Sequence, residues 1–281
     1  MSTPATRLAV LGDPIVHSRS PQLHVAAYRA LGLDWTYTRA RVEEGSLGTV
    51  LDTRGAGWRG VSVTAPLKRE ALTWCDAVTP DAARTGAVNT IVFADLDEDA
   101  ASTGSNTDIE GLMRAIERAR LDFASGHVEI LGAGDTAASA IVAAERLGAA
   151  RIAVAARRPD AADALAARMG GDIDTVRLDR WRPDEGSALI IDTIPGGYAS
   201  AEPLDDELTR RVPLMSVAYD PWPTPLAAQW RSNGATVISG LDMLLYQAVK
   251  QVRLFTNGVE DLPEIDDHAL AAIMRDALAA A

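Results

Sequence analysis

Strand-like and helix-like stretches alternate along almost the whole of this 281-residue sequence. Short apolar runs are followed by longer segments whose apolar positions recur every three or four residues, the pattern of strands alternating with helices. Strands are expected at residues 7–11, 35–42, 60–63, 87–93, 101–104, 127–131, 151–155, 173–178, 188–192, 214–217 and 236–238. This alternation predicts an α/β fold with a mainly parallel sheet covered by helices on both faces.

Helices are expected between these strands, at residues 20–31, 66–71, 107–120, 136–147, 160–169, 241–255 and 266–279. A polar turn at residues 95–99 predicts a hairpin. A second series of strands and helices starts afresh at His127. Because chains of this length usually form two domains, we expect a domain change just before it.

Charge and composition exclude several classes of protein. Lys and Arg number 27 against 39 Asp and Glu, a net charge of −12, and only 5% of residues are aromatic. Both features disfavour a nucleic-acid partner. No charge-free apolar run reaches the roughly 18 residues of a membrane span, and the N-terminus lacks an apolar signal core, so a cytoplasmic protein is expected. With Cys75 as the only cysteine and four scattered histidines, neither a disulfide nor a metal site is expected.

A glycine-rich segment carries the strongest cofactor signal. Residues 132–137 read G-A-G-D-T-A and stand between an expected strand and an expected helix. Glycine permits a tight turn and lets backbone N–H groups approach a pyrophosphate, which the helix N-terminus attracts. This context predicts dinucleotide binding, with the Asp135 side chain turned away from the phosphates.

Two arginines follow the next expected strand, at the place where an NAD site usually has an acid. Arg157 and Arg158 stand there, and no acid occurs before Asp160. Guanidinium groups match a 2′-phosphate in charge and geometry, which indicates NADP. The alternative is that both are solvated surface arginines.

The first half of the chain has polar residues at strand ends in place of a phosphate loop. Ser18 and Ser20 stand near a helix start, where hydroxyls can hold a small carboxylate, although Ser20 alone is more simply a helix N-cap. Lys68 falls one turn into a helix and, taken alone, would be a surface lysine. Asp108 suits the first turn of a helix whatever its function.

Together these segments resemble the shikimate dehydrogenase family along essentially the whole chain. Seven segments match in the family's order, at residues 12–21, 63–68, 86–90, 106–108, 132–157, 219–226 and 240–248. The sequences Y-D-P-W-P-T-P-L and V-I-S-G-L most resemble those of the actinobacterial branch. The resemblance implies an α/β substrate domain of residues 1–108, completed by C-terminal helices within 240–281, and a Rossmann-type NADP-binding domain of residues 109–239.

The implied reaction is the reversible, NADP-dependent reduction of 3-dehydroshikimate to shikimate, by a monomer or homodimer in chorismate biosynthesis. The family's acid/base pair falls on Lys68, the proton carrier, and Asp108, its orienter and a substrate ligand. The implied substrate contacts are Ser18, Ser20 and Tyr219 for the carboxylate, and Thr64, Asn89 and Gln247 for ring hydroxyls. The implied cofactor contacts are Gly132, Ala133, Gly134, Asp135, Thr136, Arg157, Arg158, Val217 and Gly240.

Some residues depart from the family pattern. Ser62 stands where many members have asparagine, and Asp192 begins a segment that is commonly N-A-T. Sister enzymes acting on quinate or aminoshikimate therefore stay open, although the two arginines argue against an NAD-preferring quinate enzyme. A protein of another class, a sensor that binds NADP and shikimate without catalysis, is disfavoured because Lys68 and Asp108 are both retained.

Overall fold

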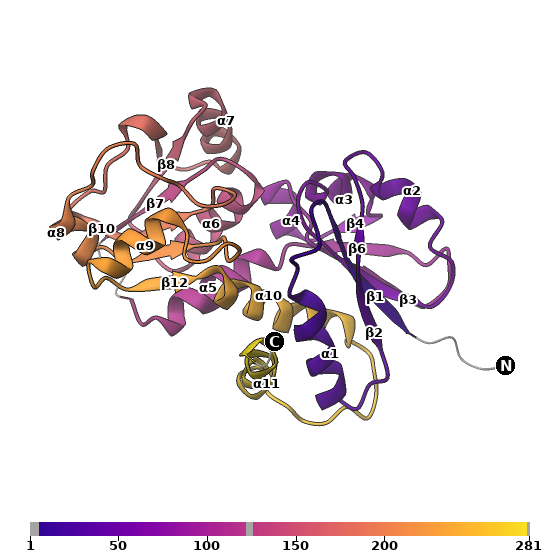
Figure 1. The fold of residues 1–281 in the computed structure, drawn as a ribbon. Helices are drawn as coiled ribbons and strands as arrows, with labels where there is room; N and C mark the ends of the chain where they lie inside the picture. Colours follow the sequence, from indigo (N-terminus) through magenta and orange to yellow (C-terminus); the bar gives the residue numbers. More distant parts are fainter. Residues whose placement is uncertain (1–5, 122–125, 280–281) are drawn as a thin grey trace. The chain divides into compact units, whose positions relative to one another are not determined.

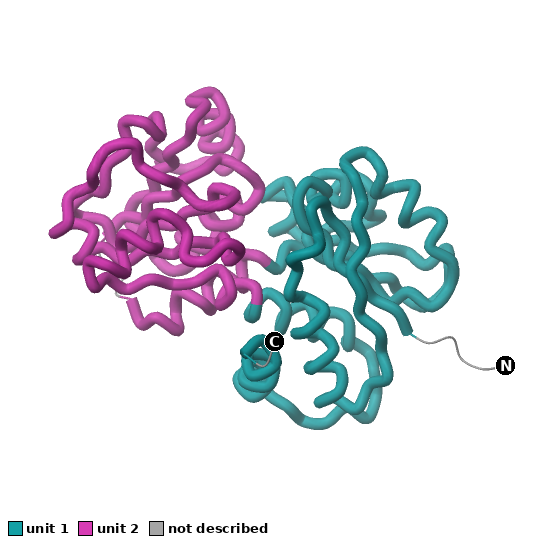
Figure 2. The backbone as a smooth tube through the Cα atoms, viewed as in Figure 1, with its two compact units in different colours: residues 1–107, 245–281 teal, residues 108–244 magenta. Residues whose placement is uncertain are grey.

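The structure is a computed structural model of the chain and describes residues 6–121 and 126–279. The chain separates into two compact units, each with its own six-stranded sheet (Figure 1). Unit 1 comprises residues 1–107 and 245–281, and unit 2 comprises residues 108–244 (Figure 2). The polypeptide thus leaves unit 1, builds unit 2, and returns to complete unit 1.

Unit 1 is built on a mixed sheet. Its strands are β1 (Arg7–Gly12), β2 (Thr36–Arg41), β3 (Trp58–Val63), β4 (Ala77–Val78), β5 (Thr90–Phe93) and β6 (Ser102–Ser105), in the order β2-β1-β3-β5-β6-β4. β1 runs parallel to β2 and β3, whereas β5 is antiparallel to both β3 and β6. The hairpin expected around residues 95–99 is confirmed, and its first strand, β5, is the reversed strand that makes this sheet mixed.

Unit 1 also contains six helices, or parts of them, in its described residues. They are α1 (Ser20–Ala30), α2 (Leu47–Asp52), α3 (Lys68–Trp74), α4 (Pro80–Thr85), α10 (Gly240–Phe255, whose first residues belong to unit 2) and α11 (Asp267–Ala279). One apolar core joins sheet residues to the region of α2 and α3, and its members include Leu11, Val61, Val63, Ile91, Phe93, Leu47, Leu51, Leu67 and Ala71. α1 packs on α11. This packing buries Leu23 and Tyr28 of α1 and Leu270 and Met274 of α11.

Unit 2 is built on a fully parallel sheet. Its strands are β7 (His127–Leu131), β8 (Arg151–Ala156), β9 (Ile173–Arg177), β10 (Ser187–Asp192), β11 (Leu214–Ser216) and β12 (Val237–Ser239). Their order is β12-β11-β10-β7-β8-β9, so successive strands run outward from β7 in one direction and from β10 in the other. This is the strand order of a doubly wound Rossmann-type sheet, whose ligands bind where the order reverses.

The helices of unit 2 connect successive strands. They are α5 (Asp108–Arg118), α6 (Asp135–Arg146), α7 (Pro159–Met169), the 3₁₀ turn η1 (Leu178–Arg180), α8 (Asp206–Arg211) and α9 (Pro225–Ser232). α6 buries an unbroken run from Ala137 to Ala144, mostly alanine. These small side chains let the helix lie close to the sheet, which brings its N-terminus against the end of β7.

The α/β class predicted from the alternation of strands and helices is confirmed. Two local details were wrong: the strand expected at 87–93 begins only at Thr90, and Lys68 is the first residue of its helix. Ser20 is also no N-cap, since α1 begins with it and Arg19 takes the cap position without a side-chain bond. Across residues 6–121 and 126–279, no helix is both long and apolar enough to span a membrane.

Candidate active site

The polar segments that the sequence singled out in unit 1 meet at one edge of its sheet. Backbone hydrogen bonds join them there: Thr64 N–H donates to the Leu11 carbonyl at 2.9 Å, and Val63 N–H donates to the Asn89 carbonyl at 2.7 Å. Lys68, at the start of α3, accepts the N–H of Val88 through its own carbonyl at 3.0 Å. The sheet edge therefore brings together the Thr64 hydroxyl, the half-buried Lys68 and the Asn89 amide, although Thr64 and Asn89 are 25 residues apart in the sequence.

The loop between β1 and α1 carries the two candidate carboxylate-binding serines. Ser20 N–H lies 3.4 Å from Ser18 Oγ, so the Ser18 hydroxyl accepts at its oxygen and can donate its own proton outward. From β2, Arg39 Nη1 donates to the carbonyls of Val16 and Ser18. With its carbonyls held by a guanidinium, the loop is left to offer O–H and N–H groups, the donors that a carboxylate needs.

Two side-chain amides, those of Asn89 and Gln247, are hydrogen-bonded to each other in the site. Asn89 is 2% exposed, and its Oδ1 accepts from the backbone N–H of Thr107 at 2.8 Å and from the Thr107 hydroxyl at 3.0 Å. Its Nδ2 donates to Gln247 Oε1 at 3.0 Å. Gln247 comes from α10, so the C-terminal return of the chain supplies a group that the first 107 residues lack.

Unit 2 carries the glycine-rich turn. Gly132 follows β7 with φ at +111°, a left-handed conformation that favours glycine, and an added Cβ would lie 2.5 Å from Thr193 Oγ1. Ala133 follows, Gly134 caps α6, and Asp135 and Thr136 form its first turn. A 12-residue helix thus points its N-terminus at the end of the central strand. Backbone N–H groups and helix dipole there suit a pyrophosphate.

A cavity of about 780 Å³ opens beside the end of β8. Its lining residues are Arg157, Leu178, Asp179, Arg182, Ile194, Pro195, Gly197, Tyr198, Ala199, Ser200, Ala201 and Glu202. Arg158 is absent from this lining and instead takes the N-cap position of α7. The two arginines, adjacent in the sequence, are therefore placed differently: Arg157 lines this cavity and Arg158 caps α7.

Asp192 shapes the loop along one side of this cavity. The carboxylate is buried and accepts the backbone N–H groups of Ile194 at 3.1 Å and Tyr198 at 2.8 Å, which curls the intervening residues around it. Burial raises the pKa of Asp192 to about 6, while the two N–H donors oppose the increase. The residue that departs from the family's N-A-T segment is thus the support of the cavity wall.

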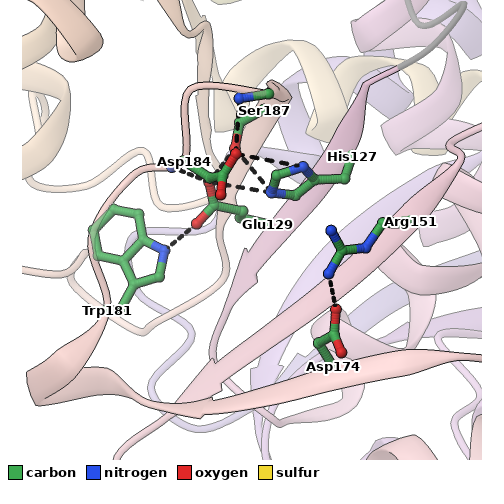
Figure 3. A network of polar contacts seen from close by, with 8 residues as sticks. His127, Glu129, Arg151, Asp174, Trp181, Asp184 and Ser187 are labelled. Carbon is green, nitrogen blue, oxygen red and sulfur yellow. Dashed lines mark hydrogen bonds and ion pairs between the residues drawn. The ribbon is translucent and has the colours of Figure 1, made fainter.

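A second buried carboxylate, that of Glu129, lies in a network of polar contacts in unit 2 (Figure 3). Glu129 of β7 is 3% exposed and accepts from Trp181 Nε1, the Ser187 hydroxyl and, at 3.0 Å, the backbone N–H of Asp184. His127 adds a fourth neighbour, with its Nε2 at 3.8 Å. Trp181 directly adjoins cavity-lining residues, so Glu129 fixes the segment that carries them. No motif of the sequence indicated this glutamate.

Val217 and Gly240 lie against each other in unit 2. Val217 N–H donates to the Asp192 carbonyl at 3.0 Å. A Cβ on Gly240 would stand 2.1 Å from the Val217 carbonyl oxygen, so this close approach requires glycine. Tyr219, two residues beyond Val217, is half-buried, and Asp108 is the buried first residue of α5. Both belong to unit 2, whereas the other candidate substrate residues and Lys68 belong to unit 1.

The glycine turn, the helix N-terminus and the arginine-lined cavity on a doubly wound parallel sheet define a dinucleotide-binding α/β protein, whose unit 1 adds a cluster of amides, hydroxyls and a lysine. Comparison with known proteins is more specific. Residues 10–91 match the family model of the shikimate dehydrogenase substrate binding domain. A shikimate dehydrogenase (NADP(+)) of Moorella thermoacetica is 34% identical over 285 residues, covering 97% of this chain and 94% of the relative. The chain belongs to the shikimate dehydrogenase family.

Solved structures agree with this assignment. Mycobacterium tuberculosis shikimate dehydrogenase is 38% identical, with a TM-score of 0.82 over 98% of this chain and 100% of its own. The shikimate 5-dehydrogenase of Thermus thermophilus, crystallised in complex with NADP(H) and shikimate, is 30% identical, with a TM-score of 0.79 over 97% and 99% of the two chains. The two-domain architecture that the resemblance implied is thus that of the similar structures.

Proposed function

We propose that this protein is an oxidoreductase that catalyses the reversible, NADP-dependent reduction of 3-dehydroshikimate to shikimate. The observation that carries the proposal is the hydrogen-bonded pair of amides, the buried Asn89 and the half-buried Gln247, at the same sheet edge as Thr64 and Lys68. Amides and hydroxyls beside a lysine suit a ring with several hydroxyl groups, one of which exchanges a proton. Membership of the shikimate dehydrogenase family supports this reading. We place the enzyme in the cytoplasm, as a monomer or homodimer.

Each group of candidate residues has a role in this proposal. Ser18, Ser20 and Tyr219 bind the carboxylate, and Thr64, Asn89 and Gln247 bind ring hydroxyls. The Arg39-held loop supports the first assignment, since it offers hydroxyl and N–H donors. The Asn89–Gln247 hydrogen bond supports the second.

The residues present fit NADP. Gly132, Ala133, Gly134, Asp135 and Thr136 would hold its pyrophosphate, since the turn leaves no room for a Cβ at Gly132 and ends in a helix N-terminus. Arg157 and Arg158 would bind its 2′-phosphate, with Val217 and Gly240 as further contacts. When bound, the reduced cofactor supplies the hydride that the carbonyl carbon accepts.

Lys68 moves the proton in this mechanism. In the reducing direction its ammonium gives a proton to the ring oxygen as the ketone becomes an alcohol, and in the oxidising direction the amine takes that proton back. Asp108 orients Lys68 and accepts a hydrogen bond from a substrate hydroxyl. The carboxylate on the ring keeps its charge throughout, so the serines contribute to binding and not to the chemical step.

A substrate panel tests the proposal. Shikimate, quinate and aminoshikimate are each mixed with NADP and with NAD, and the reduced cofactor is followed at 340 nm. The fastest turnover is expected for shikimate with NADP. Faster turnover of quinate or aminoshikimate would assign a sister reaction, and tight binding of shikimate without any turnover would make the protein a sensor.

A further inference from the structure

A chain of buried hydrogen bonds runs behind the amide pair of unit 1. It starts at Tyr37 in β2, whose hydroxyl donates to Ser62 Oγ at 2.7 Å. The Ser62 hydroxyl then donates to Gln251 Oε1 at 2.8 Å. Tyr37 and Ser62 are each 4% exposed and Gln251 is 2% exposed. Burial raises the pKa of the Tyr37 phenol, so it keeps its proton and remains a donor.

This chain fixes which way the Gln251 amide faces. Because its oxygen accepts from Ser62, its NH₂ group points the other way, where it lies 3.0 Å from Thr90 Oγ1 and 3.2 Å from Gln247 Oε1. An amide NH₂ only donates, so it requires an acceptor opposite. Gln247 stands one helical turn before Gln251 on α10, on the same face, and meets this requirement with its oxygen.

The orientation of Asn89 imposes the same requirement independently. A backbone N–H, that of Thr107, donates to Asn89 Oδ1 at 2.8 Å, and a backbone N–H has no alternative role. Asn89 must therefore turn its NH₂ toward Gln247, whose Oε1 it reaches at 3.0 Å. The Gln247 oxygen is held by two amide donors, and its NH₂ group is turned away from both of them.

We propose that Gln251 is a positioning residue that sets the hydrogen-bonding polarity of Gln247, so that the substrate meets N–H donors at this point and never a carbonyl oxygen. The proposal deepens the proposed function and rests on it for the identity of the ligand. These N–H groups can donate hydrogen bonds to the oxygen of a ring hydroxyl or of a ring ketone. An ammonium group in that place would face donors only, so the same polarity selects a ring oxygen over an amino substituent.

This arrangement explains why serine at position 62 can stand where many family members have asparagine. The family resemblance implied that a substrate-contacting amide is replaced here by a shorter hydroxyl. In the structure the Ser62 hydroxyl is buried between Tyr37 and Gln251 and orients the latter. Its role is therefore to support the amide pair from behind.

Two substitutions of Gln251 test the proposal. Gln251→Glu leaves only acceptors, which attract the Gln247 NH₂ while the Asn89 NH₂ still requires the Gln247 oxygen, so Gln247 should no longer present its N–H donors to the substrate in a single orientation. Gln251→Met removes the donor while keeping the length of the side chain. Loss of one hydrogen bond corresponds to roughly 3- to 10-fold in affinity. We expect the KM for shikimate to rise by that factor in both variants, with kcat changed less than about 3-fold, the pattern of lost uniform binding.

The decisive measurement is a double-substitution cycle with Gln247→Ala. If Gln251 acts through Gln247, its replacement should leave the KM unchanged once Gln247 is alanine. An equal rise in KM in both backgrounds would overturn the proposal and leave Gln251 with a merely structural role. The thermal unfolding midpoint of each variant is measured alongside, and an unaltered midpoint shows that unit 1, which carries the substitutions, is folded.

Two smaller substitutions, at Ser62 and Tyr37, test the same proposal if the Gln251 variants do not fold. Ser62→Ala removes the donor that orients Gln251, and should raise the KM for shikimate in the Gln247 background only. Tyr37→Phe is the matched control, because Ser62 can still donate to Gln251, and its KM should stay within about 2-fold of wild type. An effect of Tyr37→Phe as large as that of Ser62→Ala would contradict the assigned polarity.

Failure of the proposed function can be told apart from failure of this inference. If the wild-type protein does not turn over shikimate, the reaction assigned above is wrong. The polarity is then read by NMR from the side-chain NH₂ of Gln247, assigned by its loss in Gln247→Ala. It should exchange with solvent faster than the NH₂ of Gln251, and in Gln251→Glu it should become protected. A protected Gln247 NH₂ in the wild-type protein would refute the inference whatever the substrate is.

Discussion

At the scale of single residues, the choice of basic side chain is informative. Of the 27 lysines and arginines, only Lys68 and Lys250 are lysines. Lys250 is exposed on α10, whereas Lys68 is half-buried at the sheet edge of unit 1. Arginine cannot release its proton at working pH, but a lysine in a suitable environment can. A chain that otherwise uses arginine therefore keeps lysine at the position proposed to move a proton.

Lys68→Ala should lower kcat for shikimate oxidation by roughly 10²- to 10⁴-fold, the usual contribution of a general acid or base. The KM should change much less, and the Kd for NADP should not change, because Lys68 lies in unit 1 and the glycine turn in unit 2. Lys250→Ala is the matched control and should retain full activity. Near-normal kcat in Lys68→Ala at every pH would mean that the proton leaves by another route.

The two arginines after β8 allow a second prediction at this scale. Arg157→Ala should weaken NADP binding by roughly 10- to 100-fold, the value of a charge-assisted hydrogen bond, and should leave NAD binding unchanged. Arg158→Ala should have the smaller effect on NADP, because Arg158 does not line the cavity. Titration of each variant with both cofactors, followed by fluorescence or calorimetry, measures this. Equal losses of NADP and NAD affinity would show that neither arginine reads the 2′-phosphate.

At the scale of secondary-structure elements, periodicity predicted the long helices and nearly all strands, but it missed α2, α4, α8 and α9. Each of these helices has six to eight residues, too few for an apolar pattern to repeat. A signal was nevertheless present for two of them. α4 and α9 both begin at a Thr-Pro pair, in which Thr79 and Thr224 accept the N–H of the third helical residue. Capping chemistry predicts such short helices where hydrophobic periodicity cannot.

The α4 cap is testable. Thr79→Ala removes the acceptor for the Ala82 N–H and should cost about 1 kcal/mol in the free energy of unfolding, measured by denaturant titration. Thr73→Ala, an exposed threonine in α3 without a capping role, is the control and should stay within about 0.5 kcal/mol of wild type. A loss as large in the control would remove the argument for the cap.

The candidate site was predictable only in part, for a related reason. Short motifs indicated Thr64, Lys68 and Asn89, and the structure brings these segments to one sheet edge. Nothing in the sequence indicated Gln251, because its partners are 161 and 189 residues away in Thr90 and Ser62. Contacts of that range arise from the topology of the sheet and the return of the chain, which no local pattern encodes.

At the scale of the whole molecule, the two units hold buried titratable groups of opposite kind. His24 of unit 1 is fully buried, stacks on Tyr37 with ring centroids 3.9 Å apart, and lies 2.9 Å from the Ser20 carbonyl through its Nδ1. Burial lowers its pKa to about 4, while that hydrogen bond opposes the decrease. Asp192 of unit 2 has its pKa raised to about 6 by burial. Burial therefore shifts each pKa in the direction that favours the neutral form, downward for His24 and upward for Asp192.

These shifts predict that acid affects the units in opposite directions. Unfolded His24 binds a proton below about pH 6.5 and folded His24 only near 4, so unit 1 loses stability as the pH falls through this window. Folded Asp192 binds a proton already near pH 6 and the unfolded group only near 4, so this residue stabilises unit 2 over the same fall.

Unfolding followed at each unit separately, by hydrogen exchange between pH 4 and 7, measures the effect. His24→Gln, which cannot titrate, should flatten the pH dependence of unit 1, and Asp192→Asn should flatten that of unit 2. Unchanged pH profiles in both variants would show that neither group titrates in this window.

The interrupted course of the chain has a consequence for biosynthesis. Residues 108–244 form one uninterrupted stretch, whereas α11 and most of α10 are the last segments that a ribosome delivers to unit 1. During translation, residues 7–105 are made before α10, so the apolar surface of their sheet that α10 covers stays exposed for a time. In that time the whole of unit 2 is synthesised and can already fold. We expect the nascent chain to gain affinity for nucleotide well before it gains Gln247. Synthesis of residues 245–281 is thus the step at which a newly made chain becomes able to recognise its substrate.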